Sequence, residues 1–134
     1  MSPHSLLPCP HLPPAICVHS SAQATLALAA SRPVTLLSAR AAAVFAGPAW
    51  WRALIAGCAT AQPDILDCAD ASGRALEAIA LRCRIIILAK GPAWPDIAER
   101  AASAGSVLLA IRPASLDLAD PAAARHIEAW LEVG

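Results

Sequence analysis

The sequence lacks the short motifs that indicate most nucleotide and hydrolase chemistries. No strand-like segment is followed by G-x-G-x-x-G, so a dinucleotide cofactor has no support. Neither G-x-x-x-x-G-K-[ST] nor G-x-S-x-G occurs, which removes the sequence evidence for a P-loop or a nucleophile elbow. The paired acids of a phosphoacceptor receiver are missing where His19 and Ser20 stand. We therefore expect no cofactor and no metal.

The sequence also lacks a charge excess and a long apolar run. Ten basic residues balance ten acidic ones, and the bases are scattered along the chain, so we expect no nucleic-acid partner. No apolar stretch reaches the roughly 18–20 residues of a membrane-spanning helix, so we expect no membrane partner. The balanced charge does not oppose self-association, and we expect a homo-oligomer, most simply a homodimer.

Paired cysteines are absent as well. The number of cysteines is odd, and no two have C-x-x-C spacing. Three of them stand where a small buried hydrophobe would fit. This pattern favours free thiols in a reducing compartment, so we predict a cytoplasmic protein without disulfides. The cysteines are Cys9, Cys17, Cys58, Cys68 and Cys83.

The 134 residues predict a short arm and one domain. Residues 1–14 contain five prolines, which exclude a helix, and we interpret them as an arm that is disordered or strapped along the surface. His4, Cys9 and His11 of this arm carry metal-ligating atoms, which we interpret as incidental because a metal site needs rigid surroundings. Residues 15–134 form the predicted α/β domain.

Strand-like and helix-like segments alternate through this domain. We predict a three-layer α/β/α sandwich around a five-stranded parallel sheet in the flavodoxin-like order 2-1-3-4-5, with the third strand central. Residues 114–119 are predicted to be a loop. The predicted strands are residues 15–19, 34–38, a segment around Ile65 and Leu66, 84–89 and 107–111. The predicted helices are residues 22–30, 48–58, 72–83, 95–104 and one that begins at Pro121 with Asp120 as its cap, with a short helical turn over 39–45. The helix residues predicted to face the core include Leu26, Trp51, Leu54, Ile55 and Leu76.

Ligands of open parallel sheets bind at the carboxyl ends of the strands, where the strand order reverses. In the predicted order this point lies between the first and third strands, and free amides at the helix starts there favour a small anion. The candidate residues at this edge are His19, Ser20, Ser21, Trp50, Asp67, Cys68, Asp70, Ser72, Lys90 and Trp94.

Most of these candidates also have a structural interpretation. Ser20 and Ser21 suit the cap of the helix at residues 22–30, His19 suits a hydrogen-bonded strand end and Lys90 suits a turn. Asp70 and Ser72 suit helix capping, and Cys68 suits an inert buried thiol. Trp50 and Trp94 suit the core or a subunit contact, because aromatic side chains bury a large area.

Three functions follow from these candidates. The first is a non-catalytic small-ligand-binding or protein-interaction domain that self-associates. The second is a thiol-dependent hydrolase or acyl-transfer enzyme with Cys68 as nucleophile and His19 or Lys90 as its base or activating charge. In that enzyme Asp67 or Asp70 orients the base. The third is a small-anion-binding domain without turnover.

Two stretches carry a resemblance to a known group. D-I-L-D-C-A-D-A-S-G-R-A-L-E-A at residues 64–78 and A-G-P-A-W-W-R-A-L at residues 46–54 resemble segments of small bacterial α/β proteins of unknown function. The likeness covers most of the chain after the proline-rich arm. It implies a fold, and it assigns no activity and no functional residue.

Overall fold

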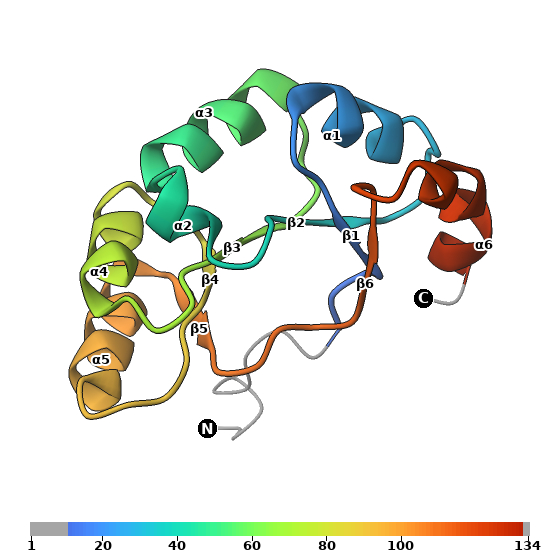
Figure 1. Cartoon of the computed structure of the whole chain (residues 1–134). Coiled ribbons are helices and arrows are strands. Elements are labelled where there is room, and N and C mark those ends of the chain that lie inside the picture. The colour runs from blue at the N-terminus through green and yellow to red at the C-terminus, as the bar shows by residue number, and fades with distance from the viewer. Residues whose placement is uncertain (1–10, 133–134) are drawn as a thin grey trace.

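The strands of the structure form one sheet in which every neighbouring pair is parallel (Figure 1). The structure is a computed structural model that describes residues 11–132. The order across the sheet is β5-β4-β3-β2-β1-β6. The strands are β1 (Ala15–Cys17), β2 (Thr35–Leu37), β3 (Asp64–Asp67), β4 (Ile85–Ile87), β5 (Val107–Leu109) and β6 (Ser115–Asp117).

Helices connect the first five strands in sequential order. Because β1 to β5 advance across the sheet in one direction, right-handed crossovers place all their helices on one face. One hydrophobic cluster accordingly contains buried residues of every α-helix together with the strand residues that face them. The helices are α1 (Ser21–Leu28), α2 (Ala42–Phe45), α3 (Pro48–Cys58), α4 (Ser72–Ala80), α5 (Trp94–Ala104) and α6 (Ile127–Glu132), with a 3-10 helix at Pro121–His126.

The predicted α/β class with a parallel sheet is confirmed, but the finer topology is wrong. The sheet has six strands in the order 5-4-3-2-1-6, where five in the order 2-1-3-4-5 were expected. The third strand remains inside the sheet. The predicted three-layer sandwich is also wrong, because the helices of residues 11–132 cover one face of the sheet and none packs on the other. The residues predicted as a loop contain β6, whose sequence S-L-D has a single apolar residue and therefore no apolar run that would mark a strand.

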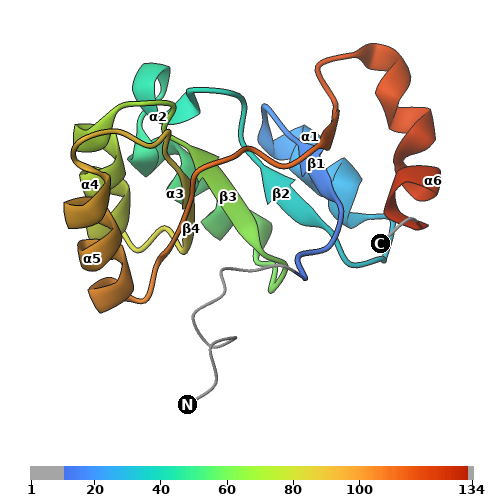
Figure 2. The ribbon, with the colours of Figure 1, turned by 90° about the horizontal axis from the view of Figure 1, so that it is seen from below.

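The helix-free face is covered by extended chain. Its buried apolar residues are Ala15, Leu37, Ile65, Ile85 and Ile87, and Leu12 packs against them. The segment that joins β5 to β6, residues 110–114 (the crossing segment), passes over this face (Figure 2). A parallel sheet is normally buried on both faces, and here segments without helix provide the second cover.

The residues just before β1 are fixed to the sheet. The hydroxyl of Thr35 donates to the carbonyl of Pro13 at 2.8 Å, and the amide of Thr35 donates to the carbonyl of Pro14 at 3.0 Å. This part of the predicted arm therefore lies along the sheet. Residues 1–10, with His4 and Cys9, lie outside the described residues.

The crossing segment requires a curved sheet. In a flat sheet, five inter-strand steps would separate β5 from β6 by about 24 Å. The six residue steps from Leu109 to Ser115 reach about 20–22 Å when fully extended, and they must also return to the amino edge of the sheet. The sheet is therefore curved, with α1 to α5 outside the arc (Figure 1).

The predicted buried face is right for some helices and wrong for others. Trp51, Leu54 and Ile55 of α3 are buried as expected. Leu26 of α1 and Leu76 of α4 were expected inside, but they are 45% and 39% exposed, and alanines of these helices face the sheet instead. Close packing of thin, alanine-rich helices selects the methyl-sized side chains for the interface.

The longest helices, α3 and α5, have 11 residues each. Within residues 11–132 no helix is long and apolar enough to cross a membrane.

Trp51 links the helical layer to β3 through a buried polar contact. Its side chain is fully buried, and its Nε1 donates to Oδ1 of Asp64 at 3.0 Å. Burial raises the pKa of Asp64, and the hydrogen bond from Trp51 opposes that rise. We expect Trp51→Phe to lower the free energy of unfolding by about 1–3 kcal/mol, because it leaves a buried carboxyl group without its donor.

Urea unfolding at neutral pH measures this loss. Trp130→Phe is the matched control, because Trp130 Nε1 donates at 2.8 Å to the carbonyl of Ala15 from a half-buried position. We expect a loss of about 1 kcal/mol there. Equal losses in the two variants would contradict the assigned role of Trp51.

Candidate functional site

The strand order reverses between β1 and β6, and polar side chains gather where these strands end. β1 to β5 extend to one side of β1, and β6 pairs with its other side. The expected reversal between the first and third strands is therefore wrong, because β2 separates them. The carboxyl edge carries a group that we term the edge cluster: Cys17, His19, Asp67, Arg112 and Asp117.

Asp67 and Arg112 form a buried ion pair within this cluster. Arg112 Nη1 donates to Asp67 Oδ2 at 2.8 Å. The side chain of Arg112 is 11% exposed and that of Asp67 is 6% exposed. Oδ1 of Asp67 accepts from the amide of Ala69 at 2.8 Å, and the amide of Asp67 donates to Oγ of Ser38 at 2.9 Å. Asp67 ends β3 and Arg112 lies in the crossing segment, so the pair connects the sheet to the chain that covers it.

Cys17 lies beside Arg112 and is buried. Arg112 Nη2 is 3.4 Å from Cys17 Sγ, and the thiol is placed to donate to the carbonyl of Ser38 at 3.5 Å. Burial raises the pKa of Cys17 to about 11, the charge of Asp117 adds to this rise, and Arg112 acts against it. The side chain is therefore a neutral thiol at neutral pH.

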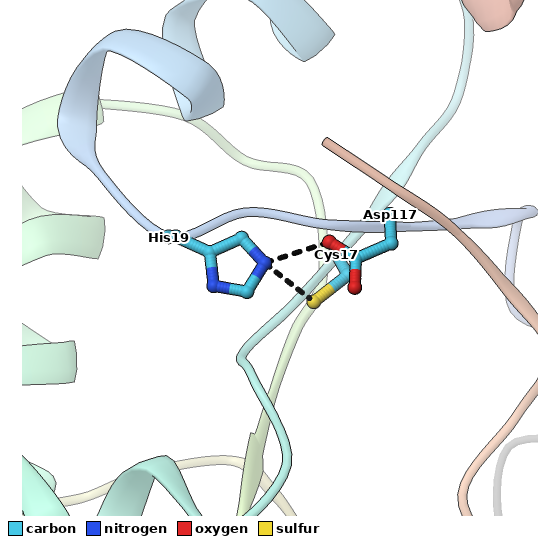
Figure 3. A group of neighbouring side chains, drawn as sticks. All are labelled: Cys17, His19 and Asp117. Atoms are coloured by element: carbon cyan, nitrogen blue, oxygen red, sulfur yellow. Dashed lines mark hydrogen bonds and ion pairs between the residues drawn. The ribbon is translucent and has the colours of Figure 1, made fainter. Parts of the chain in front are cut away.

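His19 brings Cys17 and Asp117 together (Figure 3). Its Nε2 is 2.7 Å from Asp117 Oδ1 and 3.5 Å from Cys17 Sγ. The strand register explains this convergence. Cys17 and Asp117 are directly paired in the β1–β6 ladder, and His19 follows Cys17 by two residues, which places it on the same face.

Hydrogen bonds hold His19 and Asp117 in place. Oε1 of Gln23 accepts from the amide of His19 at 2.8 Å, and Nε2 of Gln23 donates to the carbonyl of Leu118 at 3.1 Å. Burial by itself would raise the pKa of Asp117, but hydrogen bonds from the amide of Ala119 and from His19 outweigh it and lower that pKa. Asp117 is therefore a carboxylate at neutral pH.

The arrangement differs from a nucleophile-base-acid relay. In such a relay the base uses one ring nitrogen for the nucleophile and the other for the acid. Here Nε2 of His19 faces both Cys17 and Asp117, while Nδ1 points away from them (Figure 3). The three donor atoms lie within 4.8 Å of one another, which is a set of convergent ligands for one small species.

The predicted thiol site around Cys68 is not assembled. Cys68 is fully buried in the cluster on the helix side, and burial raises its pKa to about 12. Asp67, the preceding residue, points to the opposite face of the sheet, where Arg112 holds it. The ring of His19 contacts Cys17 and Asp117 and not Cys68. The ammonium of Lys90 lies over the ring of Trp94, 5.5 Å from its centroid.

The other candidates are divided between two hollows at the carboxyl edge. His19, Ser20, Ser21 and Trp50 line one of about 400 Å³, which we term the His19 hollow. Asp70, Ser72, Lys90 and Trp94 line another of about 390 Å³, which we term the Lys90 hollow. The predicted site therefore combined two sets of residues, and each set lines a hollow of its own.

Some of the structural interpretations of these residues are right and others are wrong. Ser20 caps α1 by accepting from the amide of Gln23 at 3.2 Å, as expected. The residue that precedes α4 is Ala71, and neither Asp70 nor Ser72 provides a side-chain cap. Trp50 and Trp94 are partly buried and pack against the chain's own core, so they give no support for a subunit contact.

Cys17, Arg112 and Asp117 were absent from the predicted site. Cys17 was interpreted as one more strand cysteine, Arg112 as the end of a strand, and Asp117 as part of a loop. The only sequence signal for them was A-I-C-V-H followed by a later S-L-D, and nothing local shows that these two segments pair.

Two larger hollows lie away from this edge. They measure about 490 and 460 Å³ and share the loop residues Thr60, Ala61 and Gln62, which precede β3. Their linings include first residues of strands or loops that precede strands, so they lie at the amino edge of the sheet. An open parallel sheet does not usually bind its ligand at that edge.

No protein-family model matches the sequence. A search of curated protein sequences also finds no match.

The buried ion pair gives a prediction for stability. Arg112→Met leaves the carboxylate of Asp67 buried without its partner, and we expect the free energy of unfolding to fall by about 3–5 kcal/mol. Arg74→Met is the matched control, because Arg74 and Glu77 form an equally short pair, 2.8 Å, with both side chains more than 40% exposed.

Urea unfolding of both variants measures the difference. The control is expected to cost less than about 1 kcal/mol, because solvent screens an exposed pair. Similar losses at Arg112 and Arg74 would show that burial does not strengthen the Asp67–Arg112 pair.

The raised thiol pKa values give a prediction for reactivity. Alkylation requires the thiolate, so at pH 8 we expect Cys68 and Cys17 to react roughly a thousandfold and a hundredfold more slowly than an exposed thiol, whose ordinary pKa is 9.0. Both rates should rise about tenfold per pH unit towards the respective pKa.

Peptide mapping after timed iodoacetamide treatment measures both rates, with urea-unfolded protein as the control that restores ordinary reactivity. Alkylation of native Cys68 as fast as a free thiol would contradict the assigned burial and would favour the thiol-enzyme alternative.

Proposed function

We propose that this chain is a non-catalytic domain that binds a small anion in the Lys90 hollow. The observation that carries the proposal is the start of α4. It has no side-chain cap, and its first residue, Ser72, lines the same hollow as Lys90. A phosphate or a carboxylate accepts hydrogen bonds from hydroxyl and ammonium groups such as these and is attracted by the positive charge of Lys90.

The helix start supplies part of the attraction. The first amides of a helix have no partner within the helix, and the aligned peptide dipoles add partial positive charge there. At α1 the hydroxyl of Ser20 uses one of these amides. At α4 no side chain does so, although Asp70 and Ser72 flank the first turn. This difference favours the Lys90 hollow over the His19 hollow.

Lys90 supplies the full charge, and Asp70 opposes it. The stacking of the Lys90 ammonium on Trp94 holds the charge at the rim. The carboxylate of Asp70 at the same hollow reduces the net potential and limits the affinity. The proposed ligand is therefore small and bound weakly.

We infer that the domain does not catalyse a reaction, because neither the thiols nor His19 is placed to act on a ligand in the Lys90 hollow. Burial keeps Cys17 and Cys68 protonated, with pKa values of about 11 and 12. His19 is held between Cys17 and Asp117. None of the three lines the Lys90 hollow.

A second location has its own observation in favour. Arg52 and Arg84 line the hollow of about 460 Å³ beside Asp64, and guanidinium groups bind phosphate well. The experiment below separates the two locations.

We expect inorganic phosphate to shift the backbone amide resonances of Ser72, Gly73 and Arg74 in a titration followed by NMR. Lys90→Gln should weaken binding about fivefold, the loss of about 1 kcal/mol of screened attraction. Asp70→Asn should tighten it by about two- to fivefold, because an opposing charge is removed.

Ser21→Ala, in the His19 hollow, is the matched control and should leave the affinity unchanged. Arg84→Gln tests the second location. If Arg84→Gln weakens binding and Lys90→Gln does not, the anion binds at the other edge and the proposed site is wrong. If phosphate and malonate both leave the spectrum unchanged at millimolar concentration, the proposed function fails.

A further inference from the structure

We propose that Cys17, His19 and Asp117 bind one divalent transition-metal ion of the zinc type. Their ligand atoms Sγ, Nε2 and one carboxylate oxygen lie within 4.8 Å of one another, and all three side chains point to a common centre (Figure 3). The inference does not depend on the small-anion proposal, because none of these residues lines the Lys90 hollow.

The distance from sulfur to nitrogen suits a tetrahedral ion, and the distance from nitrogen to oxygen must lengthen. With zinc bonds of about 2.3 Å to sulfur, 2.0 Å to nitrogen and 2.1 Å to oxygen, tetrahedral angles require about 3.5 Å from sulfur to nitrogen and about 3.4 Å from nitrogen to oxygen. The distance between Cys17 Sγ and His19 Nε2 is 3.5 Å. The distance between His19 Nε2 and Asp117 Oδ1 is 2.7 Å and must open by about 0.7 Å, a small movement for a side chain that is 54% exposed.

The donor types suit the same ions. A thiolate, an imidazole and a carboxylate are all zinc ligands, and a sulfur donor selects against magnesium and calcium. Three protein ligands leave a fourth position for water or a small ligand. His19 and Asp117 are 33% and 54% exposed, so that position is open to solvent, while Cys17 closes the buried side.

The charges balance when a divalent cation is bound. Binding of the metal displaces the proton of the Cys17 thiol to solvent, and the resulting thiolate and the carboxylate of Asp117 neutralise the two positive charges of the ion. The nearby guanidinium of Arg112 would repel the ion if it were alone, but Asp67 holds it at 2.8 Å and neutralises it. Arg112 Nη2, 3.4 Å from Cys17 Sγ, is placed to donate to the metal-bound sulfur.

The surroundings supply the rigid support that a metal site needs. The side chain of Gln23 accepts from the amide of His19 and donates to the carbonyl of Leu118. The amide of Ala119 donates to Asp117 Oδ1 at 2.9 Å. Such outer contacts orient ligands and are a regular part of protein metal sites. Pairing of Cys17 with Asp117 in the ladder fixes the spacing of their backbones.

The test uses the full chain, stripped with a chelator and titrated with Co²⁺ and then Zn²⁺. We expect one Co²⁺ per chain, a thiolate-to-cobalt charge-transfer band in the near ultraviolet and the intense visible bands of a tetrahedral site. Zinc should displace the cobalt and raise the melting temperature. Cys17→Ala should abolish the charge-transfer band, and Asp117→Asn and His19→Ala should each weaken zinc binding by more than the roughly 10- to 100-fold that loss of an outer contact costs.

The matched control is a triple variant, His4→Gln, Cys9→Ser and His11→Gln, which removes the other candidate ligands near the amino terminus. It should bind cobalt as the parent chain does. Asp117→Asn, at an exposed side chain, keeps the test valid if Cys17→Ala does not fold. Loss of the band in the triple variant, or its persistence in Cys17→Ala, would overturn the proposal, as would a parent chain that shows no band.

Discussion

A parallel sheet has two apolar faces, and this chain provides helices for only one of them. The strands advance in one direction from β1 to β5, so the right-handed crossovers stack every connecting helix on the same side. The other face would be exposed to water unless extended chain covered it. The crossing segment and the residues before β1 provide that cover. Both the curvature of the sheet and the position of β6 follow from this requirement.

The same requirement builds the edge cluster. A segment that crosses a sheet face in extended form points alternate side chains towards and away from it. In the crossing segment Ile111 is 81% exposed, and Arg112 reaches inward to Asp67 and Cys17. The segment then delivers β6 beside β1, which brings Asp117 to His19. The fold thus concentrates buried charge and sulfur at one edge of the sheet, and the most unusual chemistry of the molecule lies where its covering chain meets its first strand.

The sequence predicts what depends on local pattern. Short apolar runs and helix-start residues located β1 to β5, the α3 helix and the caps at Ser20 and Asp120, because these features are set by neighbours within a few residues. It does not predict what depends on distant pairing. The strand order was taken from the commonest fold of this size, and β6 has a single apolar residue, Leu116, so no apolar run marks it. Once β6 was missed, Asp117 and Arg112 had no reason to join a site, and Cys68 was preferred to Cys17 because it stood among acids in the sequence.

The pairing of the first strand with the last has a consequence for how the molecule assembles and opens. His19 and Asp117 are 98 positions apart, whereas the ladder partners Cys17 and Leu37 are 20 apart. Closing the longer loop costs about 1.4 kcal/mol more chain entropy. On chain entropy alone, β6 is therefore expected to dock on β1 after β2 has done so. Release of β6 would separate Asp117 from His19 and Cys17, and it would also loosen α6, which follows β6 and packs in the same core as the other helices. The thiol of Cys17 would then lose the cover that its ladder partner Asp117 provides.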